Sequence, residues 1–233
     1  MKTKTSTIAG QFYDADKEQL AANIESYHIN TTKDCQYLSR AVIVPHAGHQ
    51  YSGHLAAKGF QYLNPELETL FVFAPAHRVP VETLAVTSFD AFSTPLGEVY
   101  VHKDLTRDME KMGYPVIDAA FTNEHSIEVQ LPFIKQFMPN TNIVPVLVGS
   151  ANPQIITDII AKYWDNENIG FVISSDLSHF YNRQEASRID AVTADMIENN
   201  INVLENCKIF FVKLHDSADV WYNRPMKSKS AAS

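Results

Sequence analysis

The feature of the sequence that most constrains the fold is the alternation of short apolar runs with longer amphipathic segments. Continuous runs of valine, isoleucine and phenylalanine are typical of strands that are buried on both faces. The expected strands span residues 41–44, 70–73, 84–88, 99–102, 143–148 and 171–174, and the expected helices span residues 52–63, 104–112, 125–138, 153–164 and 183–200. Strands that alternate with helices predict an α/β fold, in which a largely parallel sheet, mixed at its edge, is covered by helices.

Two prolines refine this pattern. Pro132 is expected to kink or break the helix over residues 125–138, because proline lacks the backbone N–H that a helix interior uses. Pro145 lies inside the strand over residues 143–148, and a proline within a strand favours a position at the edge of a sheet.

Size, charge and cysteine content narrow the class of protein. The 233 residues contain no linker before about residue 205, so we expect one domain over residues 1–205 and a divergent, shortened tail over residues 206–233. The 27 acidic and 19 basic side chains give a net charge of -8, which argues against nucleic acid and membrane partners. Cys35 and Cys207 form no disulfide framework, and the first residues lack a signal-like apolar run. We therefore expect a cytoplasmic protein.

Histidines follow three of the predicted buried strands, at the point where each strand ends. His46 comes after residues 41–44, His77 after residues 70–73, and His179 after residues 171–174. The carboxyl ends of parallel strands meet at one edge of an open α/β sheet, and ligands bind at that edge. The sequence therefore predicts that these three histidines lie at the same edge and line one cleft.

The chemistry of such a cleft depends on which groups accompany the histidines. Neutral imidazole is the commonest metal ligand, and two imidazoles with one carboxylate suit non-haem iron. The candidate carboxylates are Asp176 and Glu128, although Asp176 could equally cap the following helix or orient a histidine. His49 either faces the cleft or fills a turn. The remaining histidines are expected to be structural: His28, His54, His102 and His215.

His125 opens a predicted helix and shares a face with Glu128. The helix dipole disfavours a charged imidazole in the first turn, so His125 would act as a base or a hydrogen-bond partner. The alternative is an ordinary exposed polar helix start. No glycine-rich phosphate loop and no Gly-x-Ser-x-Gly nucleophile motif occurs in the chain.

Six stretches of the sequence, in order over roughly residues 7–200, resemble the Memo family, which is also called AmmeMemoRadiSam system protein B. They are Ala9-Gly10-Gln11-Phe12-Tyr13, Pro45-His46-Ala47-Gly48 with Tyr51-Ser52-Gly53, Ala74-Pro75-Ala76-His77, Thr94-Pro95-Leu96-Gly97, Glu124-His125-Ser126-Ile127-Glu128-Val129-Gln130-Leu131-Pro132-Phe133, and Ser174-Ser175-Asp176-Leu177-Ser178-His179. Each stretch is weak alone, but six in the family's order are specific.

The resemblance implies a fold like the catalytic subunit of class III extradiol non-haem iron dioxygenases. It also implies that His46 and His77 bind a divalent metal, iron or copper, with zinc as a further choice. His125, Asp176 and His179 would line the same cleft and act in catalysis, with a histidine as acid or base and Asp176 orienting a histidine. A small molecule or a peptide would occupy the cleft.

Three functions remain open at this point. The leading one is a metal-dependent reaction of the dioxygenase type, with its substrate unknown. The second is a binding module without enzymatic activity that uses the same cleft for a peptide or a partner protein. The third is a metal-assisted hydrolase in which zinc activates water. None of these three functions predicts an oligomeric state.

The sequence departs from the family pattern at its end. The family's third metal-site residue is a cysteine in a Cys-Gly motif, whereas Cys207 has no following glycine and comes too soon after Asp176. His49 also replaces the usual aromatic residue. The third ligand would then be water, Asp176, His49 or another nearby group, and metal binding is expected to be weak. The segment after about residue 212 is expected to be loosely packed.

Overall fold

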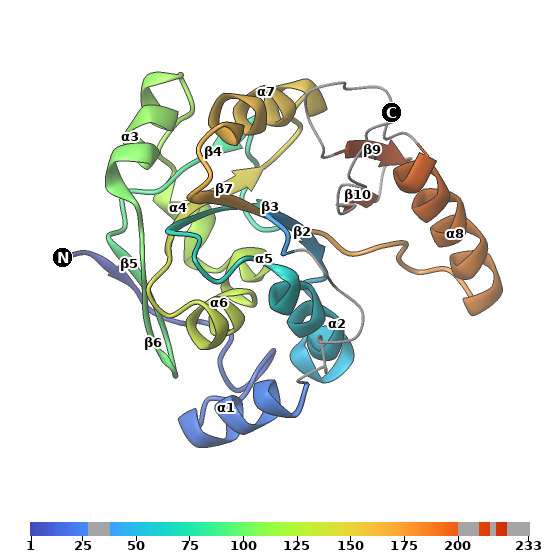
Figure 1. The fold of residues 1–233 in the computed structure, drawn as a ribbon, viewed down its shortest axis with the longest axis horizontal. Helices are drawn as coiled ribbons and strands as arrows, with labels where there is room; N and C mark the ends of the chain where they lie inside the picture. The colour runs from blue at the N-terminus through green and yellow to red at the C-terminus, as the bar shows by residue number, and fades with distance from the viewer. Residues whose placement is uncertain (28–37, 200–209, 215–217, 223–233) are drawn as a thin grey trace, which may run out of the picture.

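The computed structural model describes residues 1–27, 38–199, 210–214 and 218–222. Its centre is a five-stranded sheet in the order β2-β8-β3-β7-β4 (Figure 1). Four of these strands are parallel and the short β4 is antiparallel to β7. The predicted α/β fold with a largely parallel sheet is therefore confirmed. The strands are β2 (Ala41–Val44), β8 (Ile169–Ser174), β3 (Thr69–Pro75), β7 (Asn142–Val148) and β4 (Leu84–Ala85).

Two smaller sheets accompany the central one. In the first, β1 pairs in parallel with β5, and β5 pairs antiparallel with β6; in the second, β9 and β10 pair antiparallel. Their bounds are β1 (Thr3–Lys4), β5 (Ala91–Thr94), β6 (Gly97–Tyr100), β9 (Phe210–Leu214) and β10 (Ala218–Tyr222). The helices are α1 (Lys17–Ser26), α2 (His49–Tyr62), α3 (Lys103–Lys111), α4 (Asp118–Thr122), α5 (His125–Glu128), α6 (Leu131–Phe137), α7 (Pro153–Trp164) and α8 (Arg183–Asn199).

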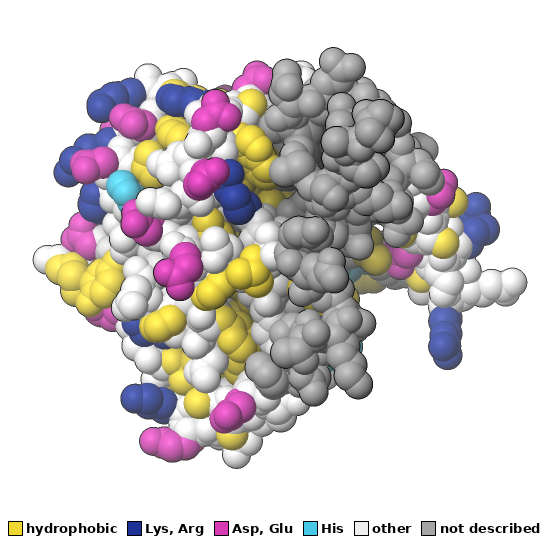
Figure 2. All heavy atoms as spheres, viewed as in Figure 1, with side chains coloured by type: hydrophobic (Ala, Val, Ile, Leu, Met, Phe, Trp, Pro, Cys, Tyr) yellow, Lys and Arg dark blue, Asp and Glu magenta, His cyan; other side chains and the backbone are white. Residues whose placement is uncertain are grey.

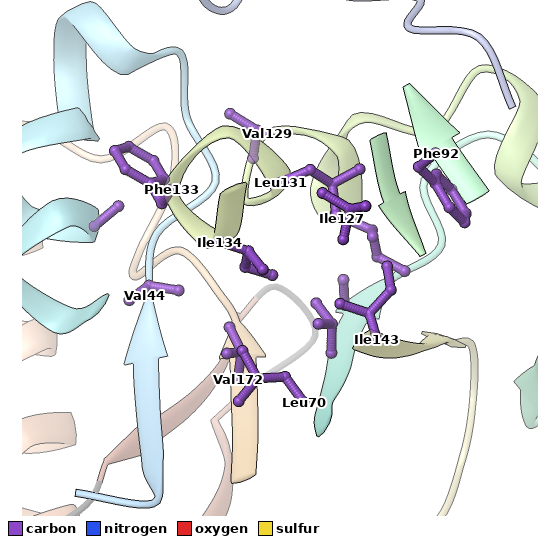
Figure 3. Packing of buried hydrophobic residues seen from close by; sticks show 14 of the residues in the cluster. Val44, Leu70, Phe92, Ile127, Val129, Leu131, Phe133, Ile134, Ile143 and Val172 are labelled. Atoms are coloured by element: carbon purple, nitrogen blue, oxygen red, sulfur yellow. The ribbon is translucent and has the colours of Figure 1, made fainter. Parts of the chain in front are cut away.

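The central sheet is buried on both faces because its strands carry apolar side chains over most of their length. Successive side chains of a strand point to opposite faces, so Leu70 and Val72 of β3 face one core while Phe71 and Phe73 face the other. Helices α2 and α6 cover the first face, and α7 covers the second (Figure 1). Figure 3 shows sheet residues of the first core packed beside Ile134 of α6.

The predictions made from Pro132 and Pro145 have different outcomes. The helix predicted over residues 125–138 is interrupted, as expected, and Pro132 lies in the first turn of α6, where its missing N–H costs little. The edge position predicted from Pro145 is wrong, because β7 lies between β3 and β4. The physical reason is that β4 is short and pairs only with Leu147 and Val148, so β4 does not pair with β7 at Pro145.

Smaller boundary differences also occur. The strand expected over residues 84–88 is limited to β4, and the one expected over residues 99–102 is displaced to β6. Helix α2 begins at His49, three residues before the predicted start. These shifts leave the order of strands and helices unchanged.

The C-terminal part of the chain is only partly described. Strands β9 and β10 lie in the segment that was predicted to be a divergent tail, so part of that segment has regular structure. Residues 223–233 and Cys207 lie outside the described residues, as do Cys35, His28 and His215. The domain boundary near residue 205 stays a prediction.

The surface offers two further observations. On the face seen in Figure 2, acidic and basic side chains are interspersed with apolar ones over the described part of the chain. Within that part, none of the helices combines the length and the apolar character that crossing a lipid bilayer requires.

Candidate metal centre

Three histidines converge at the carboxyl edge of the central sheet. His46 follows β2, His77 follows β3, and His125 is the first residue of α5. Each can offer one ring nitrogen such that the three nitrogens lie within 4.8 Å of one another. The rings of His77 and His125 stack with centroids 4.7 Å apart, and the ring of His46 meets that of His77 edge-on at 5.3 Å. This spacing allows a single ion to contact all three imidazoles.

His46 lies at the buried end of this histidine cluster. Its side chain is only 5% exposed, and its Nδ1 lies 3.2 Å from the Ser174 hydroxyl at the end of β8. The backbone N–H of His46 donates to Asp176 Oδ1 at 2.7 Å. Asp176 therefore fixes the backbone at His46, while Ser174 contacts the ring.

His77 lies at the exposed end of the cluster, with 39% of its side chain accessible. Its ring is held by Glu124, whose Oε1 lies 2.9 Å from Nδ1, while Oε2 accepts from the backbone N–H of the same histidine at 2.6 Å. An ionised carboxylate only accepts hydrogen bonds, so Nδ1 of His77 carries the hydrogen. In the neutral ring the free lone pair is then on Nε2, the nitrogen that a metal would use.

Glu124 also organises the start of α5. Its carboxylate accepts from the backbone N–H groups of His125 and Ser126, which caps the helix. Burial raises the pKa of Glu124, but the hydrogen bonds from His77 and Ser126 outweigh burial and lower the pKa to about 2. The carboxylate is therefore ionised at neutral pH and sits behind two of the three histidines.

Burial keeps the imidazoles of His46 and His125 neutral. It lowers the pKa of His46 to about 4, assisted by the neighbouring His77 and His125 and opposed by Asp176 and the Ser174 backbone. Burial also lowers the pKa of His125, against the attraction of Glu124. Neutral rings at physiological pH have lone pairs available for a metal.

The residues present fit a divalent cation. Nδ1 of His125 is buried without a hydrogen-bond partner, although it lies 3.2 Å from Glu124 Oε1 without the alignment of a hydrogen bond. A buried polar atom without a partner is costly unless a ligand satisfies it or rearranges its neighbours. Three imidazoles with the carboxylates of Glu124 and Asp176 close behind form a donor set whose two carboxylate charges balance a 2+ ion.

Asp176 and His179 extend the cluster along the same edge. Asp176 Oδ2 lies 3.7 Å from His46 Nε2 and 3.5 Å from His179 Nε2. The structure thus brings His46, His77 and His179 to one edge, following the neighbouring parallel strands β2, β3 and β8. Asp176 does not cap α8, whose N-terminal turn is capped by Asn182. Of the two alternatives for Asp176, orientation of a histidine fits the contacts.

Two other sequence-based candidates lie elsewhere. Glu128 faces away from the histidine cluster and binds Lys4 at 2.6 Å, together with the hydroxyl and backbone groups of the N-terminal segment. The sequence offered it as a candidate carboxylate that shares a helix face with His125, yet its carboxylate is occupied by these contacts with Lys4 and the N-terminal segment. His49 packs on Phe133, and its Nε2 bonds to the Val129 carbonyl, so it is a core residue.

The two described histidines that were expected to be structural, His54 and His102, lie outside the histidine cluster. His102 caps α3 through Nδ1, which accepts from the Leu105 backbone at 3.3 Å. His54 is exposed on α2. Neither belongs to the histidine cluster.

Sequence reasoning gave no role to three residues that hold the cluster in place: Glu124, Gln130 and Ser174. Glu124 offered a signal, because an acidic residue directly before a histidine at a helix start can cap the helix and reach nearby rings. Gln130 and Ser174 offered none, because their contacts join segments far apart in the chain.

Replacing Glu124 with glutamine is expected to weaken metal binding by about 10- to 100-fold, the usual effect of losing a partner that orients a ligand. Glutamine has one acceptor oxygen, whereas Glu124 uses both oxygens to accept from His77. Calorimetric titration with Zn²⁺ measures the change. The exposed Glu110→Gln variant is the matched control. Equal affinity of Glu124→Gln and wild type would contradict the assigned role.

Comparison with known proteins identifies the family of this chain. The family profile described as "Memo: Memo-like protein" matches residues 4–210. The chain is 34% identical over 196 residues to the protein memo-1 homolog of Caenorhabditis elegans, covering 81% of this chain and 56% of that protein. It is 31% identical over 197 residues to protein MEMO1 of Homo sapiens, covering 80% of this chain and 66% of that protein.

An archaeal protein is similar to the same degree. The MEMO1 family protein of Archaeoglobus fulgidus is 32% identical over 195 residues, which is 82% of this chain and 73% of the relative. The chain thus spans just over half to about two thirds of the length of the animal relatives named above. The matched stretch includes the segments that carry His46, His77 and His125.

Proposed function

This chain belongs to the Memo family, whose profile matches residues 4–210. On that basis we propose that it is a metal-binding protein with oxidative activity. Its histidine cluster would hold a divalent iron or copper ion on His46, His77 and His125. The observation that carries this proposal is that one ring nitrogen from each of three histidines lies within 4.8 Å of the others, although the histidines come from three separate segments of the chain.

The donor set supports a first-row transition metal. Imidazole suits iron, copper, nickel and zinc, whereas magnesium and calcium prefer oxygen donors. A redox-active ion bound here would bring O₂ and an organic substrate together, as the resemblance to extradiol-type dioxygenases implies. His125 takes the place of the third ligand, which the sequence left to water, Asp176, His49 or another nearby group.

Asp176 and His179 would manage protons beside the metal. His179 is 42% exposed, and its Nε2 lies 3.5 Å from Asp176 Oδ2, so the ring can exchange protons with solvent while the carboxylate orients it. Asp176 in turn holds the backbone of His46. A proton accepted from a substrate at this end of the cluster would pass to solvent through His179.

Access to the cluster is from the side of His77 and His179, because their side chains are 39% and 42% exposed while that of His46 is 5% exposed. A small molecule, or a side chain of a peptide, is therefore the proposed occupant. A cytoplasmic location is part of the proposal, since a reducing compartment keeps iron in the Fe(II) state.

A second candidate function is supported by one observation. Three histidine ligands with an open position also suit catalytic zinc, which activates water for hydrolysis. The identity of the bound metal separates this candidate from the oxidative one, since zinc does not change its oxidation state.

The test is metal analysis of protein purified without air, followed by O₂ uptake in the presence of catechol-like compounds. About one equivalent of iron or copper per chain, with O₂ uptake that depends on the compound, is the expected result. Tight zinc without O₂ uptake would support the hydrolase instead. Failure to bind iron, copper or zinc after reconstitution of the apoprotein would contradict both.

A further inference from the structure

We propose that the Ser174 hydroxyl is a positioning group that determines which ring nitrogen of His46 carries the hydrogen. It holds the hydrogen on Nδ1 and leaves the lone pair on Nε2. The importance of this tautomer for metal binding rests on the proposed function, whereas the tautomer itself is a property of the protein without metal.

The inference begins with the surroundings of Ser174, the last residue of β8. The residue is 1% exposed, so water does not complete its hydrogen bonding. Its hydroxyl oxygen has three neighbours at hydrogen-bond distance: the Ser126 carbonyl at 2.7 Å, Gln130 Nε2 at 2.8 Å and His46 Nδ1 at 3.2 Å.

The hydrogens can be assigned by counting. A serine hydroxyl has one hydrogen to donate and two lone pairs that accept. The Ser126 carbonyl only accepts, so it takes the single hydrogen of Ser174. The amide nitrogen of Gln130 only donates, so it fills one lone pair. The remaining lone pair faces His46 Nδ1, which must therefore donate its own hydrogen.

The orientation of the Gln130 amide is consistent with this assignment. Its Nε2 also lies 2.9 Å from the Pro45 carbonyl, which requires a donor at that position. Gln130 thereby joins the residue before His46 to β8, and Ser174 joins β8 to the residue after His125. One hydroxyl thus connects the segments that carry two of the three histidines.

The tautomer has a direct consequence for the histidine cluster. A neutral imidazole binds a metal only through the nitrogen without a hydrogen. If Nδ1 of His46 carries the hydrogen, Nε2 is ready to bind without rearrangement, as it is in His77 through Glu124. Two unrelated groups, a hydroxyl and a carboxylate, would then prepare two rings in the same tautomer.

The first experiment uses ¹⁵N-histidine NMR of the whole metal-free chain at neutral pH. The His46 signals are assigned by comparison with the His46→Gln variant. The expected spectrum shows a protonated Nδ1 and an unprotonated Nε2 for His46. If His46 of the wild-type protein carries its hydrogen on Nε2, the proposal is overturned, and no Ser174 variant is needed for this test.

The second experiment compares Ser174→Ala with Ser174→Thr. The alanine variant removes the hydroxyl that lies 3.2 Å from His46 Nδ1, whereas the threonine variant keeps a hydroxyl at the same position, so the comparison isolates the hydroxyl. Alanine is expected to yield a mixture of tautomers and about 10-fold weaker Zn²⁺ binding, and threonine to restore the wild-type tautomer. The matched control is Thr141→Val, which removes another buried hydroxyl that donates to a carbonyl far along the chain, at Leu67.

The two readouts separate this inference from the proposed function. A Ser174→Ala spectrum identical to wild type would overturn the inference, even if the wild type binds metal tightly. If the wild type fails to bind iron, copper and zinc while the tautomer still depends on the hydroxyl, the positioning role stands and the metal function fails. If Ser174→Ala does not fold, the wild-type tautomer decides the proposal.

Discussion

Replacement of His125 by alanine is expected to lower the affinity for a divalent metal by at least about 100-fold. Loss of a group that merely orients a ligand typically costs about 10- to 100-fold, so loss of a ligand should cost at least as much. The expectation follows from the position of His125, whose ring stacks on His77 at 4.7 Å within the histidine cluster. Calorimetric titration of the apoprotein with Zn²⁺, and with Fe(II) without air, measures the change.

Controls separate a lost ligand from a damaged fold. His54→Ala removes an exposed histidine from α2 and is expected to bind as the wild type does. The thermal midpoint of apo His125→Ala reports on folding independently of metal. Unchanged affinity in a folded His125→Ala variant would show that another residue completes the site. Loss of binding in Cys207→Ala would then assign that role to the cysteine.

Replacement of Lys4 by methionine is expected to destabilise the fold by about 3 to 5 kcal/mol, the usual result of removing one partner of a buried ion pair. The side chains of Lys4 and Glu128 are 4% and 1% exposed, and their charged atoms lie 2.6 Å apart. Methionine fills a similar volume but leaves the Glu128 carboxylate buried without its counter-charge. Urea unfolding followed by circular dichroism measures the loss.

The pH dependence of this pair has a definite sign. Burial raises the pKa of Glu128, but Lys4 and the backbone N–H groups of Thr7 and Ile8 outweigh burial and leave it below its usual value. Stability from such a group is present above the unfolded-state pKa, about 4.3, and is lost as the pH falls through the folded-state value. Acid unfolding of Lys4→Met is therefore expected to begin at a higher pH than that of the wild type.

A matched surface pair serves as the control. Lys2→Met removes the partner of Asp118 from an exposed ion pair, and such pairs usually contribute less than about 1 kcal/mol. A loss in Lys4→Met no larger than in Lys2→Met would contradict the anchoring role of Glu128. The double variant Lys4→Met with Glu128→Gln should recover part of the loss, because no unpaired buried charge remains.

The sequence alone predicted the parts of the fold that depend on local pattern. The runs at residues 41–44, 70–73 and 171–174 lie in β2, β3 and β8, because strands buried on both faces carry nearly continuous apolar side chains. Strand direction then placed His46, His77 and His179 at one edge. This step required only that the strands be parallel, which their alternation with helices indicated.

The edge of the sheet was less predictable. Pro145 indicated an edge strand, but the structure adds β4 beside the far end of β7. The sequence predicted a strand over residues 84–88, where β4 lies, but not that β4 would pair with β7, because that pairing depends on the loop that carries β4.

The roles of individual polar residues depended on tertiary structure. His125 and Glu128 share a short helix, yet His125 turns toward His46 and His77 while Glu128 binds Lys4. Spacing along a helix gives relative direction only, and the neighbouring segments decide which side chain faces which partner.

The sequence by itself thus determined the α/β architecture and the edge where the histidines collect, because these follow from periodicity and strand order, and its six motif stretches carried the resemblance to the family. Only the tertiary structure decided that His125 completes the histidine cluster and that Glu124 and Ser174 hold its rings. A hydrogen bond such as the one from Ser174 to Ser126 is sensitive to differences of a few tenths of an ångström in the distance between its atoms, and it joins segments separated by dozens of residues. Local sequence carries no record of such contacts, since each partner would be equally compatible with its own strand or helix without the other.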